Sequence, residues 1–470
     1  MVSFIIKELQ NNQNDHVIMK SIRTFILLML ALMAQTFFVA CDDDSTDFND
    51  DVVTISDDGT ASDGSVFSSI DEKSFYLDHV KYQLNDECLV VTGIDNELFK
   101  GAIKVVFAVK YKGKLYEVHE IGPGAFFGSQ ISKISLPISI KHIADYAFRS
   151  CRNLTSINIP NPVTRIGSFA FYECENLSSI DIPSSVTTIG EWAFSGCSSL
   201  ASVNIPSSMT SIGGKAFTGC ISLKSIRIPS SVTDIGDNAF NNCPSLRSIV
   251  VDKDNPIYDS RNNCNAIVET SSNTLLYGCS NTIIYDSVTE IGKNAFIGCT
   301  SLTSIDIPNS VTEIGDGAFQ GCYSLATIDI PNSVTKIGNS AFCYCTSLSS
   351  ITIPNSVTKI DINTFHDCTS LTTITIPNSV TEIGDWAICG CTSLTTINIP
   401  SSVAEIGNCA FWKCTAVTSV HCQRSTPPHL RGDSFDLSIY DTATLYVPKG
   451  ASDNYRSKDI WKTFKNIVEE

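Results

Sequence analysis

The sequence has few of the residues, and none of the short motifs, that usually carry out catalysis. Its seven histidines are scattered over 470 residues, and no recurring partner accompanies them. It contains no nucleophile elbow, no phosphate-binding loop and no His-Glu-x-x-His zinc motif. Because nothing assembles an acid–base pair or a ligand set, the sequence predicts a protein that is not an enzyme, with no catalytic residues, no metal and no cofactor.

Positive charge is scarce as well. Lysine and arginine together number 32 against 49 aspartates and glutamates, which leaves a formal net charge of −17. An acidic surface does not attract nucleic acid or an anionic membrane surface electrostatically. The composition therefore argues against nucleic acid as a partner and in favour of a well-solvated protein.

Long apolar runs are missing, apart from one near the N-terminus. An uncharged apolar stretch over residues 25–40 follows Lys20 and Arg23 and stops at a cysteine. It is shorter than the roughly 20 residues that a membrane-spanning helix needs, and its charge pattern is typical of an export signal. Met19 offers a second start, so we interpret residues 1–40 as an extension followed by a lipoprotein signal peptide.

The tetrad that ends this run, Phe38-Val39-Ala40-Cys41, resembles a lipobox. In a lipobox a peptidase cleaves before a cysteine whose thiol has been acylated, so Cys41 is the predicted lipid anchor. Phe38 departs from the usual leucine, and a plain cleaved signal or a membrane span are the alternatives. The aspartates after Cys41 resemble the surface-export tag of some Gram-negative lipoproteins. They predict a lipid-anchored protein of the outer membrane, exposed on the cell surface, with a periplasm-facing or secreted protein as the alternative.

Two segments separate the anchor from the main body of the chain. Residues 41–70 are rich in Asp, Ser and Thr and poor in large apolar side chains, which predicts an acidic flexible tether. Residues 71–118 contain short β-type runs, among them 105–109 and 115–118, and predict a β-rich N-terminal cap.

Cysteine recurs every 23 residues through most of residues 119–420. A period of 23 and the leucine spacing within each unit predict a leucine-rich-repeat solenoid of about twelve coils. We expect a parallel sheet on one side, with short helical turns and short strands on the other. The cysteines stand at 151, 174, 197, 220 and 243, and again at 299, 322, 345, 368, 391 and 414.

Each position in the unit has a structural role that the unit at 301–323 illustrates. Leu302, Ile305 and Ile307 have the spacing of a strand whose alternate side chains point inward, and Pro308 ends that strand because it lacks a ladder donor. Further along each unit, apolar residues turn inward from the opposite wall.

The end of the unit predicts a short helical turn. Asp316 is a residue type that caps helices, and Ala318 and Cys322 have the spacing that places two side chains on one helical face. A phenylalanine, Phe319 in this unit, follows the alanine in almost every coil, and Ile388 replaces it once.

The regular spacing is interrupted once, between the two cysteine series. Residues 250–286 contain two β-type runs, 266–269 and 274–277, around the turn-like Thr-Ser-Ser-Asn, and predict a hairpin that projects from the solenoid. Cys264 and Cys279 flank this hairpin, so a disulfide between them is one interpretation and two free thiols the other.

The pattern decays after the last ladder cysteine. Residues 421–470 contain a β-type run at 444–447 and a helix-like segment at 453–467. Because the last strand of an open parallel sheet exposes an unpaired edge, we interpret this region as a strand-plus-helix C-terminal cap.

The repeat motif Leu-x-x-Ile-x-Ile-Pro-x-Ser-Val-Thr-x-Ile-Gly-x-x-Ala-Phe-x-x-Cys closely resembles that of the BspA-like leucine-rich-repeat surface proteins. The resemblance covers residues 118–420 and extends to the ending Leu-Tyr-Val-Pro-Lys-Gly at 445–450. It implies a surface protein that takes part in adhesion or binds host or neighbouring-cell proteins, without enzymatic activity. It does not transfer a ligand, because members differ at exposed positions.

The cysteines allow more than one interpretation. A small apolar thiol packed between coils explains the ladder, and a series of disulfides is the alternative. Cys343 with Cys345 and Cys389 with Cys391 form two Cys-x-Cys pairs, but no histidines recur beside them, which argues against metal binding.

The outward positions of the strands are the candidate ligand-binding residues, because side chains that alternate with the inward leucines and isoleucines face solvent. They provide a hydrogen-bonding surface for a protein or glycan, or are small polar residues that merely tolerate close strand stacking. The column consists of Asn158, Asp181, Asn204, Arg227, Asp306, Asp329, Thr352, Thr375 and Asn398.

Two other features are candidates for contact with a partner. Tyr146, Phe169, Trp192 and Trp386 share the position before the alanine of the turn and predict partly exposed ledges, with packing as the alternative. The tripeptide that starts at Arg431, Arg-Gly-Asp, matches an integrin motif, although so short a match often arises by chance.

Taken together, the sequence predicts a cell-surface lipoprotein that presents a repeat platform to a protein or glycan ligand outside the cell. Its contact with the membrane is through the lipid anchor only. The alternative is a structural lipoprotein with a constant partner inside the cell envelope.

Overall fold

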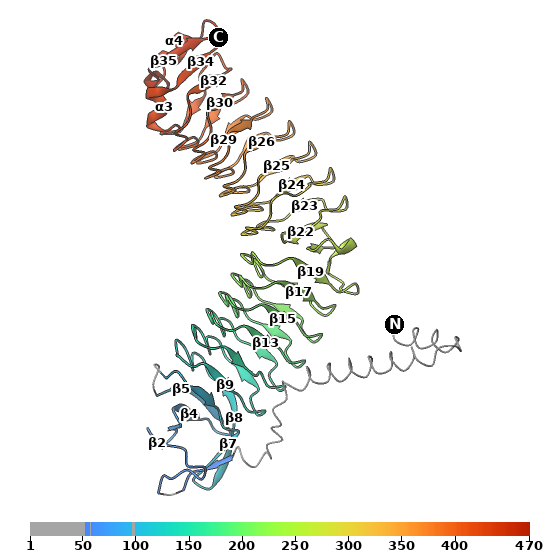
Figure 1. Cartoon of the computed structure of the whole chain (residues 1–470), viewed down its shortest axis with the longest axis vertical. Coiled ribbons are helices and arrows are strands. Elements are labelled where there is room, and N and C mark those ends of the chain that lie inside the picture. Colours follow the sequence, from blue (N-terminus) through green and yellow to red (C-terminus); the bar gives the residue numbers. More distant parts are fainter. Residues whose placement is uncertain (1–51, 57, 96–98) are drawn as a thin grey trace, which may run out of the picture. The chain divides into compact units, whose positions relative to one another are not determined.

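The structure is a computed structural model that describes residues 52–470 except 57 and 96–98. The predicted signal peptide, Cys41 and the first part of the tether lie outside the described residues. Residues 53–470 form one compact unit, a parallel-sheet solenoid of about 15 turns with few helices (Figure 1). The predicted solenoid is confirmed, with a few more turns than the twelve expected.

The N-terminal cap is built from eight strands. Strands β2 to β5 form antiparallel pairs, and β5 then pairs in parallel with β8, whose last residues begin the repeat ladder. The strands are β1 (Val52–Thr54), β2 (Phe67–Ser69), β3 (Ser74–Leu77), β4 (Val80–Leu84), β5 (Leu89–Ile94), β6 (Ala102–Lys104), β7 (Ala108–Tyr111) and β8 (Lys114–Ile121).

The cap begins earlier than the sequence indicated. Strand β1 pairs with β7 and β2 pairs with β3, although both lie in residues assigned to the tether. Val53 and Ile55 are buried, so a few apolar side chains within an otherwise polar segment are enough to attach it to the cap. The polar average composition of residues 41–70 gave no sign of these two buried side chains.

One wall of the solenoid, called here the strand wall, carries the strands with the outward polar positions. Partners lie 23 residues apart, as in Ser179↔Ser202, so each position pairs with its equivalent in the next coil. Its strands are β9 (Lys133–Ser135), β11 (Ser156–Ile157), β13 (Ser179–Asp181), β15 (Ser202–Asn204), β17 (Ser225–Ile228), β19 (Ser248–Val251), β26 (Ser350–Thr352), β28 (Thr373–Thr375), β30 (Thr396–Ile399) and β32 (Ser419–Cys422).

The opposite wall, called here the isoleucine wall, is also a parallel ladder, made of two-residue strands. Each strand directs one isoleucine inward, except the last, where Leu430 takes this place, and Ile189 pairs with Ile212 in the next coil. Its strands are β10 (His142–Ile143), β12 (Arg165–Ile166), β14 (Thr188–Ile189), β16 (Ser211–Ile212), β18 (Asp234–Ile235), β23 (Glu290–Ile291), β24 (Glu313–Ile314), β25 (Lys336–Ile337), β27 (Lys359–Ile360), β29 (Glu382–Ile383), β31 (Glu405–Ile406) and β33 (His429–Leu430).

The segment that joins the isoleucine wall to the next strand, called here the turn edge, consists of tight turns and not of a helix. Phe148 donates its N–H to Ala170 O of the next coil at 2.7 Å. The Asp316 carboxylate accepts from the backbone N–H of Asn339, one coil further, at 2.8 Å, so it links coils and does not cap a helix. The spacing of Ala318 and Cys322 was compatible with a helix, but hydrogen bonds between coils replace those within one.

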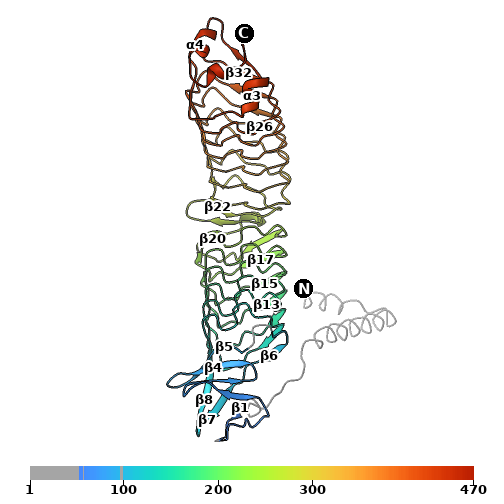
Figure 2. The same cartoon turned by 90° about the vertical axis from the view of Figure 1, so that its left-hand side faces the viewer.

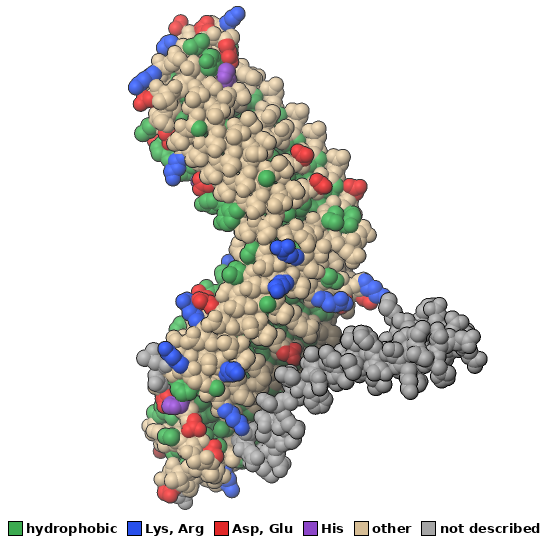
Figure 3. All heavy atoms as spheres, viewed as in Figure 1, with side chains coloured by type: hydrophobic (Ala, Val, Ile, Leu, Met, Phe, Trp, Pro, Cys, Tyr) green, Lys and Arg blue, Asp and Glu red, His purple; other side chains and the backbone are tan. Residues whose placement is uncertain are grey.

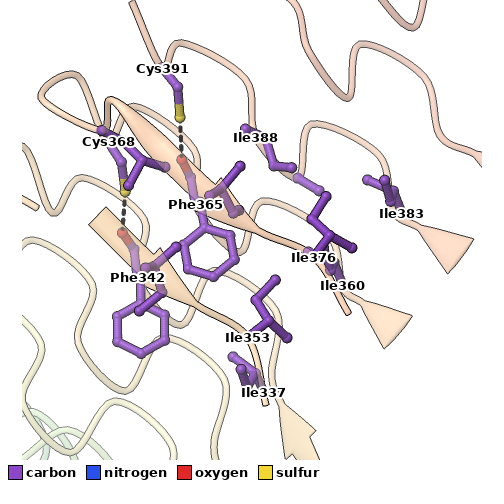
Figure 4. Packing of buried hydrophobic residues seen from close by; sticks show 14 of the residues in the cluster. Ile337, Phe342, Ile353, Ile360, Phe365, Cys368, Ile376, Ile383, Ile388 and Cys391 are labelled. Carbon is purple, nitrogen blue, oxygen red and sulfur yellow. Dashed lines mark hydrogen bonds between the residues drawn. The ribbon is translucent and has the colours of Figure 1, made fainter. Parts of the chain in front are cut away.

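A column of stacked phenylalanines fills the core beside the turn edge. The rings of Phe319 and Phe342 lie 5.3 Å apart and almost parallel. The ring of Phe365 follows 5.6 Å beyond that of Phe342 (Figure 4). Ile388 continues the column where the phenylalanine is replaced, and it is equally buried. One coil cannot enclose this core, so stacking of neighbours supplies the stability.

The ladder cysteines are free thiols packed in the same core. Each donates to a main-chain carbonyl of the preceding coil, as Cys368 Sγ does to Phe342 O at 3.2 Å and Cys391 Sγ to Phe365 O at 3.4 Å (Figure 4). Burial raises the pKa of the Cys322 thiol to about 12, so the thiol stays protonated and can donate. The buried-thiol interpretation of the ladder therefore holds in this structure.

The insertion forms the expected hairpin but builds it into the stack. Strands β21 (Ile267–Glu269) and β22 (Thr274–Tyr277) pair in antiparallel fashion, and β20 (Tyr258–Asp259) pairs with β21. Strand β22 also pairs in parallel with β23, so the hairpin extends the isoleucine wall instead of simply projecting (Figure 2). Leu275 is fully buried, because the hairpin takes the place of a coil.

The insertion also divides the core, and its two flanking cysteines are free thiols, the second of the two interpretations that the sequence left open. Cys279 packs with the N-terminal hydrophobic cluster and Cys264 with the C-terminal one. Both are free thiols, and the Cys279 Sγ donates to Asn265 O at 3.3 Å. The equal spacing around the loop suggested that the two would meet, but they serve opposite sides of the junction.

The C-terminal cap continues the strand wall with β34 (Thr444–Val447) and β35 (Asn466–Glu469). The predicted strand at 444–447 is confirmed. The predicted helix over 453–467 is wrong, because α4 (Ser452–Arg456) ends early and a 3-10 turn at Trp461–Thr463 leads into β35. The cap also contains α3 (Leu437–Thr442), and β35 covers the edge that β34 would otherwise expose.

Candidate binding surface

The predicted column of outward residues lies on the strand wall, and all nine side chains are exposed. Strand β13 shows how this comes about: Ile180 and Ile182 are buried, and Asp181 between them points outward beside Asn204 of β15. The alternation of the strand therefore places these residues as expected.

Three of the nine residues meet in a shallow groove on the N-terminal half of the strand wall. The groove has a volume of about 620 Å³ and is shaped by the ends of three successive strands. Asn158, Asp181 and Asn204 supply its polar groups, and Ile138, with 52% of its surface exposed, supplies an apolar contact. The same proline of each unit lines the groove, at Pro160, Pro183 and Pro206.

The three polar residues of the groove are not equivalent. Asn158 hydrogen-bonds the Leu136 backbone twice, accepting from its N–H at 2.9 Å and donating to its carbonyl at 2.8 Å. This side chain extends the strand ladder and has a structural role. In the part of the chain that the structure describes, the side chains of Asp181 and Asn204 have no hydrogen-bond partner, so both are available to a ligand.

The remaining residues of the column differ in charge along the solenoid. Arg227 forms an ion pair with Asp252. Asp306 and Asp329 are bridge partners in neighbouring coils, so two like charges lie side by side and repel each other. Threonines follow at Thr352 and Thr375. Figure 3 shows charged side chains of both signs scattered among uncharged ones on the visible face.

The column extends further than the sequence indicated, into the C-terminal cap. Register pairs Asn398 with His421 and His421 with Tyr446. The two rings stack at 4.5 Å with an angle of 7° between planes, and the His421 imidazole lies 3.0 Å from the Glu470 carboxylate. The cysteine spacing ends before this region, but the alternation around His421 in β32 is the signal that identifies it.

The predicted aromatic residues of the turn edge form two separate clusters. Tyr146, Phe169 and Trp192 stack in sequence at 5.0 and 5.8 Å. Trp386 lies in the C-terminal half, where its ring is 6.2 Å from that of His366. The repeat pattern pointed to these aromatic residues but not to Arg149, which lies beside Tyr146 and Phe169.

The integrin-like tripeptide is exposed but already engaged. Arg431 forms an ion pair with Glu405, and its backbone N–H donates to Ile406 O at 2.9 Å. The ladder of the isoleucine wall therefore holds this segment close to the solenoid.

The described residues contain neither a metal-binding cluster nor a membrane-spanning helix. They contain no group of three or more His, Cys, Asp or Glu side chains placed to hold a metal ion. Within the same residues, no helix has both the length and the apolar character to cross a membrane.

The family model for the BspA type leucine-rich repeat region matches this chain. It finds six copies, over residues 119–250, 270–365 and 335–436. No curated protein sequence matches the chain.

Solved structures of similar proteins share the fold. A leucine-rich cell surface protein from Faecalibacterium prausnitzii is 28% identical, with a TM-score of 0.57, and the match covers 80% of this chain and 98% of that one. The pneumococcal vaccine antigen PcpA has a TM-score of 0.60 over 85% of this chain and 98% of its own, but at 18% identity it shows the fold alone. The repeat, its two ladders and the match of the family model over more than half of the residues show that this chain belongs to the BspA-type leucine-rich-repeat family, whose members are binding scaffolds of the cell surface.

Proposed function

We propose that this protein is a cell-surface scaffold that captures a protein or glycan ligand on the strand wall, with the groove at Asp181 and Asn204 as the centre of contact. The observation that carries the proposal is that these two side chains are exposed and unpartnered, within the described chain, beside an apolar rim. A binding site of this kind combines a few orienting polar groups with apolar contact.

The rigidity of the scaffold supports this role. The groove lies on strands β11, β13 and β15. Ile157 and Ile180 of the first two strands are buried in the same continuous cluster as the stacked phenylalanines of the turn edge, and Val203 of the third packs against it. Polar groups held in place by such a core lose little freedom when a ligand binds. The surface therefore acts as a preformed template.

The binding test uses protein that starts at Asp42, because strands β1 and β2 complete the cap. This protein is presented to a panel of host matrix proteins, cell-surface proteins and glycans. Asp181→Lys with Asn204→Lys is expected to weaken capture at least tenfold, since it replaces acceptors by bulky cations. Thr352→Lys with Thr375→Lys, in the same column on the other half, is the matched control. Equal binding by both variants would show that the ligand contacts another part of the protein.

We further propose that Cys41 carries a lipid that holds the protein on the outer membrane with the solenoid outside the cell. Cys41→Ala is expected to release the protein from membranes, and protease treatment of intact cells is expected to remove the solenoid. Retention of the variant on membranes counts against the lipid. Survival of the solenoid, together with a constant envelope partner in pull-downs, would favour the structural alternative.

A further inference from the structure

A second candidate surface lies on the turn edge of the first coils, away from the strand wall. Two neighbouring columns of this edge carry bulky side chains over four coils and surround one guanidinium group. The Arg149 Cζ atom lies 5.5, 5.7, 5.7 and 5.2 Å from the centres of four rings. We call this set the arginine–aromatic patch; it consists of Phe127, Tyr146, Arg149, Phe169, Tyr172 and Trp192.

The turn of the repeat requires a left-handed backbone at one position, and the patch places bulky side chains there. Tyr146, Phe169 and Trp192 have φ angles of 63°, 57° and 58°, in the left-handed region that bulky side chains avoid. Other coils place Asn238 and Gly317 at the same position, with φ of 60° and 61°. Residues that suit the conformation are therefore available to the repeat, and aromatic ones occur here despite a cost of about 1–3 kcal/mol each.

Two rings of the patch are exposed and the other three are half-buried, and none of them belongs to the buried core column. Phe127 has 53% and Tyr146 has 40% of its surface accessible. The core has its own separate column, in which Phe148 and Phe171 are fully buried. Exposed aromatic side chains gathered at one place, beside a cation, mark a contact surface more than a packing feature.

Arg149 has no carboxylate partner among the described residues, although the chain is rich in acids. Its neighbour Arg152 pairs with Glu173 at 2.9 Å and with Glu175 at 3.3 Å. The Nε of Arg149 is buried without a hydrogen-bond partner. Aromatic rings attract a guanidinium through its faces. The two terminal Nη groups at its edge remain free to form two parallel hydrogen bonds with a planar carboxylate.

We propose that the arginine–aromatic patch binds an acidic sugar at the end of a glycan, with the sugar carboxylate on Arg149 and its apolar C–H face on Phe127 and Tyr146. One unpaired guanidinium suits one carboxylate. A net charge of −17 and the nearby Glu173 repel ligands with many negative charges, such as nucleic acid or an acidic peptide. This site is separate from the groove on the strand wall.

Binding of 3′-sialyllactose and of lactose to the protein is the test, measured by saturation-transfer NMR and calorimetry. The two sugars share a neutral core and differ in the acidic residue. The acidic sugar is expected to bind at least tenfold more tightly. Arg149→Gln is expected to abolish this preference, and Arg149→Lys to keep only part of it, because lysine retains the charge but not the paired donors.

The exposed Arg247→Gln is the matched control, since it removes the same charge from another coil and is expected to leave binding unchanged. Circular dichroism verifies that each variant is folded. Equal binding of both sugars, an unchanged preference in Arg149→Gln, or tighter binding of a Glu-containing peptide would overturn the proposal. Asp181→Lys with Asn204→Lys is expected to leave sugar binding intact, so failure here is distinct from failure of the strand-wall groove.

Discussion

The thiol of Cys368 donates to the carbonyl oxygen of Phe342, 3.2 Å away in the preceding coil. Nine further ladder positions make the equivalent contact, from Cys151 to Cys414, and in the last of them the acceptor is Ile388 O. The conserved geometry from coil to coil explains why the residue is cysteine: it fills a small apolar space and also supplies a weak donor.

Replacement of one ladder thiol tests this role. Cys368→Ala is expected to lower the free energy of unfolding by about 1–3 kcal/mol, since it leaves a small cavity and removes a donor. Urea unfolding followed by circular dichroism measures the change. Cys409→Ala, at a half-buried cysteine off the ladder, is the control and is expected to cost no more than about 0.5 kcal/mol. Equal effects at both positions would contradict the assignment.

The buried thiols also predict how stability depends on pH. Burial raises the pKa of Cys197, Cys243 and Cys322 from the usual 9.0 to about 12. A thiol whose pKa is higher in the folded protein contributes its full stability below pH 9, and this contribution is lost as the pH rises toward 12. The unfolding temperature is therefore expected to fall steadily above pH 9. A constant unfolding temperature between pH 9 and 11 would show that the thiols are not buried.

The junction between the two hydrophobic clusters is expected to be sensitive at Gly278. A Cβ atom at this position would lie 2.1 Å from Cε1 of Phe296, the first ring of the C-terminal column. Gly278→Ala is expected to cost about 1–3 kcal/mol through overpacking. Hydrogen exchange is expected to rise first in residues 264–300. Gly93→Ala is the control, because its Cβ would meet only ordinary contacts.

The two roles found within the groove can be separated by mutation. Asn158→Ala removes two hydrogen bonds to Leu136 and is expected to cost about 0.5–1.5 kcal/mol of stability. Asp181→Ala is expected to change stability by less than about 0.5 kcal/mol, since the side chain has no partner in the described chain, and to weaken ligand binding. Loss of stability in Asp181→Ala, without loss of binding, would assign it a structural role instead.

Much of the fold followed from the sequence because the same residue types recur at fixed positions. The spacing of Leu302, Ile305 and Ile307 was enough to predict an inward strand face, and the exposed position of Asp181 followed from alternation. The turn edge was less predictable. Ala318 and Cys322 have helical spacing, and only the hydrogen bonds between coils show that the segment is a set of turns.

Contacts between different coils or between irregular segments were the hardest to foresee. Cys264 and Cys279 are placed symmetrically about a loop, but the insertion assigns them to separate clusters. The break before the last strand occurs at Ile460, whose φ of 69° is unusual for a β-branched residue and follows from the packing of the cap. Arg149 was missed because its significance depends on four rings from three coils.

The most direct test of a binding role for the strand wall is a hydrogen-exchange footprint of the protein with a ligand captured from the surface panel. We predict slower exchange in β11, in β13 and β15, which carry Asp181 and Asn204, and at Asn158, directly after β11, with no change on the isoleucine wall. Protection limited to the isoleucine wall, or absent from these three strands, would contradict it.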